Sequence, residues 1–313
     1  MTSALTIAHI SDLHLSPEHG RKNIRATRKL LEHIGNLGVD HLVITGDVAA
    51  NAEKKDLQIA RAILKSTGWL DPKLLSVVIG NHDIFGGVHR AEDILTFPRH
   101  CKRTDYSGKV SEFHDFFHEA FDQCMHVGDD SPFPFGKVVG DALLVGINSV
   151  AEYSRVGNPI GSNGEVDDRQ FRHIEKILGS ELLKGKKKIV LIHHHFYKKK
   201  EEGGGRMHSI WNAIERQTMK LRGKKKLMKS FGEGGVDLVL HGHVHENKEY
   251  VRRKLRFLNG GGAVLEHSGK RPQYNLIKIV GGSVQTERSF APLESAGRGH
   301  TVVMDGAVTH AAA

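Results

Sequence analysis

The amino-acid sequence predicts a mixed α/β fold in which largely parallel strands are buried between helices. Short runs rich in Val, Ile and Leu alternate along the chain with amphipathic stretches, which is the pattern of βαβ units. The chain has 313 residues, of which 39% are hydrophobic, so it can bury a large core. This length allows one large α/β domain or two ordinary ones.

The expected elements follow from these runs in chain order. Apolar and β-branched runs predict strands over 6–12, 40–47, 74–81, 142–149, 188–195, 236–243, 254–261 and 274–280. Helical periodicity predicts helices over 23–35, 52–67, 168–178 and 209–230. Asp167 and Asp168 open the third of these helices, where aspartate favours the N-cap.

A long segment, 84–139, separates the third predicted strand from the fourth and holds most of the thirteen phenylalanines. It is too long for a simple connection, so we expect a folded insertion or a lid. Within it an apolar stripe recurs at helical spacing, formed by Val110, Phe113, Phe117, Phe121 and Cys124. The stripe predicts that the insertion packs onto the body of the domain. The alternative is an apolar wall over a substrate site.

One domain is expected over residues 1–285, with the insertion inside it, followed by a C-terminal tail over 286–313. The formal charge of +9 favours anionic partners such as phosphates. The two cysteines, Cys101 and Cys124, form no metal-type pair and no disulfide framework, which suits a reducing compartment. The N-terminus lacks the features of a leader, and no window has the roughly 18 apolar residues of a membrane span. We therefore expect a soluble cytoplasmic protein without a transmembrane segment.

Polar side chains follow the predicted strands where each strand ends. The sequences at these ends are Asp12-Leu-His14, Gly46-Asp47, Gly80-Asn81-His82-Asp83, His193-His194-His195 and Gly242-His243-Val-His245. Ligands of open α/β sheets bind beyond the carboxyl ends of the strands, so we expect these side chains to converge. Residues two apart on an extended chain face the same side, which lets Asp12 and His14 reach one centre. The same spacing relates His243 to His245. The preceding glycines allow the backbone to pass close to an ion.

The ligand types indicate which metals would bind. Carboxylate, carboxamide and imidazole ligands without a thiolate point to manganese, iron or zinc, whereas Ca²⁺ prefers an all-oxygen site. The candidate ligands outnumber the needs of one tetrahedral site. Two metal ions that share a bridging carboxylate are the natural count.

In this order, "SDLHLS", "TGDVAAN", "GNHD", "IHHHF" and "HGHVH" resemble the motifs of the calcineurin-like metallophosphoesterases. The resemblance covers residues 11–245, with a core from 6 to about 280, and implies a four-layer α/β/β/α sandwich with a dinuclear metal centre. It implies one metal held by Asp12, His14, Asp47 and His245, and a second held by Asp47, Asn81, His243 and one histidine of 193–195. The family ligand lies two residues before a proline, and Phe196 takes that proline's place. His194 is therefore the preferred ligand, and His193 is the reserve.

The resemblance also implies that a hydroxide held by both metals attacks phosphorus, with His82 as the catalytic side chain. His82 would stabilise the phosphoryl oxygens or protonate the leaving oxygen. Many family members orient this histidine with an aspartate, but Ala50 stands at that position here and Asn51 follows it. Either Asn51 or Asp83 substitutes, or the ring of His82 is held less tightly. His241 is expected to support the ligands or to pack nearby.

The motifs look most like those of the bacterial phosphodiesterase branch, which includes cyclic-nucleotide and glycerophosphodiester phosphodiesterases. This predicts a small phosphodiester substrate. One alternative is a DNA nuclease of the same superfamily, which the positive charge would suit. Its basic runs, however, are not interleaved with aromatic residues, as platforms for stacking single strands would be, so a nucleic-acid partner is not favoured. A second alternative is a non-catalytic interaction module on the same fold, which would be expected to have lost ligands. The sequence does not indicate the oligomeric state.

Overall fold

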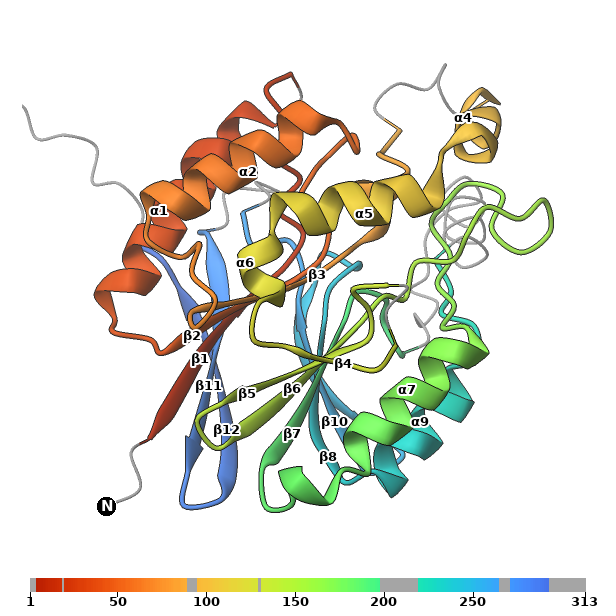
Figure 1. The fold of residues 1–313 in the computed structure, drawn as a ribbon. Helices are drawn as coiled ribbons and strands as arrows, with labels where there is room; N and C mark the ends of the chain where they lie inside the picture. Colours follow the sequence, from red (N-terminus) through yellow and green to blue (C-terminus); the bar gives the residue numbers. More distant parts are fainter. Residues whose placement is uncertain are drawn as a thin grey trace, which may run out of the picture.

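Two β-sheets pack face to face between helical layers, as the computed structural model shows (Figure 1). The structure describes residues 4–18, 20–88, 95–128, 131–197, 219–264 and 271–292. The predicted α/β fold with four layers is confirmed.

The first sheet has the strand order β12-β11-β1-β2-β3. Its strands are β1 (Leu5–Ile10), β2 (His41–Thr45), β3 (Leu75–Val78), β11 (Gln273–Val280) and β12 (Ser283–Phe290). The three N-terminal strands are parallel, with Ile7 opposite His41 and Leu42 opposite Leu75. β11 and β12 complete the sheet as an antiparallel hairpin beside β1. β2 and β3 are buried along their whole length, as expected of parallel strands that are covered on both faces.

The second sheet has the order β4-β5-β6-β7-β8-β10-β9. Its strands are β4 (Met125–His126), β5 (Phe135–Val139), β6 (Ala142–Ile147), β7 (Lys187–Ile192), β8 (Val236–His241), β9 (Asn247–Arg252) and β10 (Leu255–Gly260). β6, β7, β8 and β10 run parallel, and the flanking strands are antiparallel. The carboxyl ends of β7 and β8 therefore point the same way.

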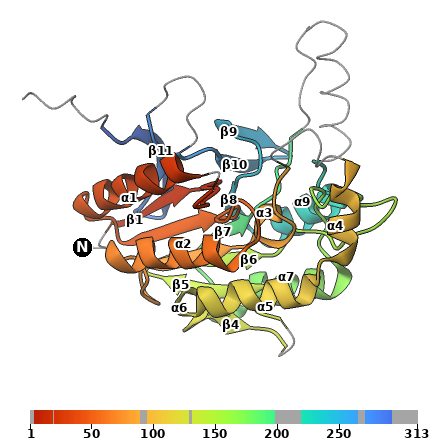
Figure 2. The ribbon, with the colours of Figure 1, turned by 90° about the horizontal axis from the view of Figure 1, so that it is seen from above.

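Helices cover the outer faces of both sheets (Figure 2). α1 (Arg21–Asn36) and α2 (Lys54–Ser66) lie over the first sheet, and α7 (Asp168–Leu178) and α9 (Lys224–Glu233) lie over the second. A short 3₁₀ helix, η2 (Glu181–Leu183), follows α7. One hydrophobic cluster fills the space between the sheets and under α1 and α2, while another lies under α7 and α9. None of the described helices is both long and apolar enough to cross a bilayer.

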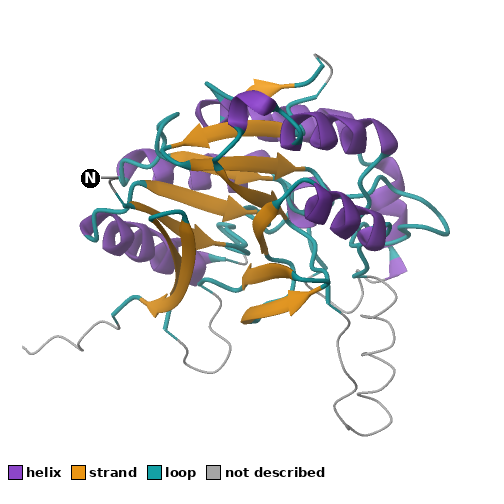
Figure 3. Ribbon diagram, turned by 90° about the horizontal axis from the view of Figure 1, so that it is seen from below, coloured by secondary structure: helices purple, strands orange, loops and turns teal. Residues whose placement is uncertain are grey.

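The segment 84–139 packs onto this body through its apolar stripe. It forms α4 (Phe97–Arg103), α5 (Tyr106–Phe116) and α6 (His118–Phe121), together with β4 and β5. Val110, Phe113, Phe117 and Phe121 are buried in the main core, and Cys124 packs against it. The packing interpretation of the stripe is confirmed, because these side chains fill the core. Figure 3 shows the helices and strands of the molecule from below.

Several predicted boundaries differ from the observed ones. The strands predicted over 40–47, 74–81, 188–195 and 236–243 end earlier, at Thr45, Val78, Ile192 and His241. The polar residues after β2 and β7 lie in the loops that follow these strands, and Gly242, His243 and His245 follow β8 in the same way, whereas Asn81 begins the short helix α3 (Asn81–Ile84) after β3. The expected boundary at 285 falls inside β12, and most of the predicted helix 209–230 precedes α9 or lies outside the described residues.

Candidate metal centre

Side chains from both sheets meet beyond the carboxyl ends of the central strands. Loops after β1, β2 and β3 bring candidate ligands from the first sheet, and loops after β7 and β8 bring them from the second. Ligand atoms lie within 4.8 Å of one another in three groups, which are Asp12, His14 and His245; His14, Asp47 and His82; and Asp47, His193 and His243. The shared members Asp47 and His14 make this one continuous cluster.

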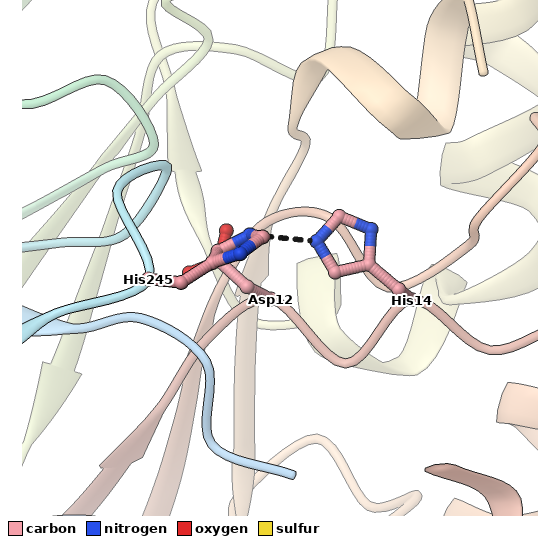
Figure 4. Close-up of side chains that lie close together, drawn as sticks. All are labelled: Asp12, His14 and His245. Carbon is pink, nitrogen blue, oxygen red and sulfur yellow. Dashed lines mark hydrogen bonds between the residues drawn. The ribbon is translucent and has the colours of Figure 1, made fainter. Parts of the chain in front are cut away.

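The first group joins the loop after β1 to the loop after β8 (Figure 4). His14 Nε2 lies 3.1 Å from His245 Nε2, and Asp12 lies beside the two rings. The backbone N–H of His243 donates to both oxygens of Asp12, at 3.0 and 3.2 Å, which fixes the carboxylate. Burial raises the pKa of the Asp12 carboxyl. A Cβ on Gly242 would lie 2.6 Å from Asp12 Oδ2, so the close approach of these loops requires glycine there.

The third group is centred on Asp47 and His193. Asp47 Oδ2 lies 3.3 Å from His193 Nε2, and the backbone N–H of His82 donates to Asp47 Oδ1 at 2.8 Å. The same His193 nitrogen lies 3.1 Å from Asn81 Oδ1 and 3.1 Å from His243 Nδ1. Burial alone would raise the pKa of Asp47, but the charge of His193 holds it well below its usual range. Burial alone would lower the pKa of His193, and the Asp47 carboxylate raises it to about 9.

The structure places His193 in the cluster and His194 outside it, although the sequence prediction preferred His194. His193 Nδ1–H donates to the carbonyl of Thr45 at 2.8 Å, which turns Nε2 toward Asp47. A histidine that donates one ring N–H to a carbonyl presents its other nitrogen as a ligand. Both nitrogens of His194 are engaged elsewhere, with Ser149 Oγ at 2.8 Å and the carbonyl of Ser162 at 3.3 Å.

The candidate ligands converge for a different reason from the one that the two-residue spacing suggested. The backbone is not extended at these positions, because φ is 56° at Asp12, 45° at His14, 51° at Asp47 and 71° at His243. Non-glycine residues rarely adopt this left-handed conformation, and it costs on the order of 1–2 kcal/mol. The loops therefore curl around the cluster. His241, still in β8, points away, and its Nε2 lies 2.8 Å from the Tyr250 hydroxyl.

Neither Asn51 nor Asp83 orients the ring of His82. Its Nδ1 lies 3.0 Å from the backbone carbonyl of Ala50, the residue at the aspartate position of the family motif. Asp83 instead accepts backbone N–H groups from Ala49 at 2.7 Å and Gly80 at 2.8 Å. It thereby connects the loop after β2 to the loop after β3. Burial raises the pKa of Asp83 to about 8, with the charge of Asp47 adding to the shift.

A cavity of about 440 Å³ opens over the cluster. Asp47, Asn81, His82, His243 and His245 line it together with Ile160, Ser162, Met219, Val244 and Glu246. Sequence reasoning missed Ile160, Ser162 and Met219, because they lie in irregular segments without a motif. Glu246 directly follows "HGHVH", so its proximity could have been inferred.

The donor set fits two transition-metal ions. Buried carboxylates, one carboxamide oxygen and several imidazole nitrogens converge, and Asp47 belongs to two of the three groups, as a bridging carboxylate would. Two pairs of imidazole nitrogens also lie 3.1 Å apart, His14 Nε2 with His245 Nε2 and His193 Nε2 with His243 Nδ1. A cation between such nitrogens would satisfy both.

These features define a two-sheet α/β protein with a metal-type cluster at the strand ends. A family model described as calcineurin-like phosphoesterase matches residues 5–247. The chain therefore belongs to the calcineurin-like phosphoesterase family, whose members use a dinuclear metal centre. Membership implies metal-dependent hydrolysis of phosphoric esters.

Solved structures share the fold at low sequence identity. A dimetal phosphatase from Danio rerio is 12% identical, with a TM-score of 0.56 over 92% of this chain and 99% of that chain. The purple acid phosphatase PPD1 from yellow lupin (Lupinus luteus) is 13% identical, with a TM-score of 0.55 over 93% of this chain and 52% of that chain. No curated protein sequence matches this chain.

Proposed function

We propose that the protein is a phosphodiesterase that uses two metal ions to hydrolyse a small phosphodiester. The observation that carries this proposal is the set of candidate ligands that follow successive strands: Asp12, His14, Asp47, Asn81, His193, His243 and His245. All but Asn81 belong to the three close groups, and Asn81 contacts His193. His193 takes the place that the sequence prediction gave to His194. When bound, the two ions supply positive charge to the phosphoryl oxygens and activate water for attack.

The chain's own residues supply the rest of the chemistry. Asp47 is ionised at neutral pH, which suits a carboxylate shared by two ions. The half-buried ring of His82 lines the cavity beside Asp47, where it can donate a hydrogen bond to a phosphoryl oxygen or a proton to the leaving oxygen. Ile160, Met219 and Val244 supply apolar lining to the same cavity.

The charge around the cavity favours a diester over a monoester. A phosphomonoester has a second pKa near 6, so it carries nearly two negative charges at pH 7, whereas a diester carries one. Among the described residues that line the cavity none is Lys or Arg, and Glu246 adds a carboxylate at its mouth. The Tyr197 hydroxyl holds this carboxylate with a hydrogen bond of 3.3 Å. The extra charge of a monoester is therefore opposed. The cavity volume suits a small substrate.

The test compares bis(p-nitrophenyl) phosphate with p-nitrophenyl phosphate after metal removal and reconstitution with Mn²⁺, Fe²⁺ or Zn²⁺. We expect the diester to be preferred. We expect Asp47→Ala to lose at least 10²-fold in kcat, while Asp115→Ala, at an exposed carboxylate, keeps the parent activity. No turnover with any metal would overturn the enzymatic function. A preference for the monoester would overturn the diester assignment alone.

Glu246→Gln tests the charge argument directly, because glutamine can still accept the Tyr197 hydrogen bond. We expect kcat/KM for the monoester to rise relative to that for the diester. A panel of cyclic nucleotides, glycerophosphodiesters, UDP-diacylglucosamine and single-stranded DNA then identifies the substrate class. Turnover of DNA alone would favour the nuclease alternative.

A further inference from the structure

Backbone groups of Ala50 and Gly87 contact the ring of His82, in addition to the ring of His14. Its own backbone N–H is fixed on Asp47 Oδ1 at 2.8 Å, which anchors the start of α3 (Asn81–Ile84) but leaves the side-chain torsions free. The ring lies edge-on to His14, with 4.5 Å between ring centroids and 79° between planes. Two further neighbours, the Ala50 carbonyl and Gly87, also constrain the orientation of the ring.

The first of these neighbours is the carbonyl of Ala50. His82 Nδ1–H donates to this oxygen at 3.0 Å, so in the neutral ring Nε2 is the nitrogen that carries no proton. The oxygen belongs to the main chain of the loop after β2. The orientation of the ring is consequently independent of the side chain at position 50.

The second neighbour is Gly87. A Cβ on this residue would lie 2.5 Å from His82 Cε1, 2.8 Å from His82 Nδ1 and 3.4 Å from the Ala50 carbonyl oxygen. The backbone of Gly87 therefore packs directly against the ring edge that faces Ala50. Its φ lies outside the left-handed region, so an alanine suits the backbone and only the imidazole opposes it. Gly86 differs, because its φ of 74° favours glycine regardless of neighbours.

We propose that Gly87 is a positioning residue for His82. Together with the Ala50 carbonyl it holds the imidazole toward the cavity, and it takes over the orienting role for which this chain has no aspartate at position 50. The role of His82 in turnover rests on the proposed function. The steric coupling of Gly87 to His82 is independent of that function.

The first test is a double-mutant cycle on thermal unfolding of the metal-free protein. Gly87→Ala is expected to lower the melting temperature, and in a His82→Ala background the same change is expected to have no effect, because the clashing ring is gone. Gly232→Ala is the matched control, since a Cβ there meets nothing within 4 Å. An equal loss from Gly87→Ala in both backgrounds would overturn the proposal. If Gly87→Ala alone is not recovered folded, recovery of the double variant supports the coupling and failure of both contradicts it.

The second test uses the reconstituted enzyme. Gly87→Ala should lower kcat for bis(p-nitrophenyl) phosphate about as much as His82→Ala, on the order of 10²-fold, and leave KM and bound metal unchanged. The double variant should be no slower than either single variant. Loss of bound metal in Gly87→Ala would contradict the positioning role. If the parent shows no turnover, the proposed function fails, while the unfolding cycle still decides the coupling.

Discussion

Four candidate ligands hold their side chains in place with a strained backbone. Asp12, His14, Asp47 and His243 all adopt the left-handed conformation without being glycine. Such conformations persist where the surrounding structure enforces them, and they gather at functional sites. Here the enforcing contacts are visible, for example the His243 N–H that donates to Asp12. These contacts fix the positions of the candidate ligands.

Two substitutions of His14 separate this strain from the loss of the ring. We expect His14→Gly to be more stable than His14→Ala by about 1 kcal/mol in metal-free protein, because only alanine keeps the cost of a φ of 45°. Urea denaturation measures the difference. The control compares His33→Gly with His33→Ala, inside α1. There we expect the alanine variant to be the more stable one by about 1 kcal/mol. Equal stability of the two His14 variants would contradict the strain.

A buried histidine remote from the cluster makes stability depend on pH. His41 donates Nδ1–H to the carbonyl of Lys73 at 2.8 Å, and its Nε2 accepts from the Ser76 hydroxyl at 2.9 Å. Burial lowers the pKa of His41 from 6.5 to about 4. The unfolded chain therefore binds the proton first as pH falls. The stability associated with neutral His41 is present above pH 6.5 and is lost between about pH 6.5 and 4, by on the order of 3 kcal/mol.

The free energy of unfolding of His41→Gln should accordingly vary less with pH over this window than that of the parent. Urea denaturation at several pH values measures the slope. His118→Gln, at a half-exposed ring, should keep the parent slope. An unchanged slope in His41→Gln would exclude His41 as the source.

Among the secondary-structure elements, the sequence pattern predicted most of the buried strands but not where they end. The strands β1, β2, β3, β6, β7, β8, β10 and β11 were predicted, because their buried residues are mostly apolar. β9 and β12 were missed, because these edge strands are mostly exposed and polar, and β4 and β5 were missed within the predicted insertion. The polar residues after the inner strands were correctly found, yet they were assigned to the strands themselves. Residue type cannot reveal the left-handed backbone that follows β1, β2 and β8.

One buried lysine connects the insertion to the first sheet. Lys137, in β5, donates its ammonium to the carbonyls of Pro72 at 2.9 Å, Leu75 at 3.0 Å and Ala120 at 2.7 Å. Burial lowers the pKa of this lysine. The carbonyls belong to the segment that enters β3 and to α6, so a single side chain satisfies acceptors from two layers.

Lys137→Met should be strongly destabilising, by roughly 3–5 kcal/mol, because it removes the ammonium that donates to the carbonyls of Pro72, Leu75 and Ala120. Urea denaturation checks this value. Lys278→Met, at an exposed ion pair on β11, should change stability by less than about 1 kcal/mol. Similar effects of the two changes would show that the Lys137 contacts contribute little.

For the whole molecule, the sequence predicted the fold and where the candidate ligands converge, but it preferred His194 where the structure places His193 in the cluster. The ordered motifs at strand ends carried both inferences. His193, and not His194, contacts the Thr45 carbonyl. Because Thr45 belongs to the first sheet and His193 follows a strand of the second, this contact can be known only once the relative placement of the two sheets is known. The support of His82 by the Ala50 carbonyl was invisible for the same reason, since a main-chain acceptor leaves no trace in residue type.

Metal removal should destabilise the whole molecule. An ion that binds only the folded chain adds about 4 kcal/mol when present at 1,000 times its Kd. We expect the melting temperature to fall on chelation and to recover with Mn²⁺ or Zn²⁺. Asp47→Ala should show a much smaller metal-dependent shift, and Asp115→Ala should show the full shift. If the melting temperature of the parent protein changes neither on chelation nor on addition of metal, the candidate centre is contradicted.

Two of the three ligand groups combine residues from both sheets. Asp12 and His14 come from the first sheet and His245 from the second, and Asp47 likewise meets His193 and His243. Neither sheet alone offers these sets. During folding, therefore, high-affinity metal uptake has to wait until the two sheets have docked. The rate at which a refolding chain captures an ion would report that last step of assembly.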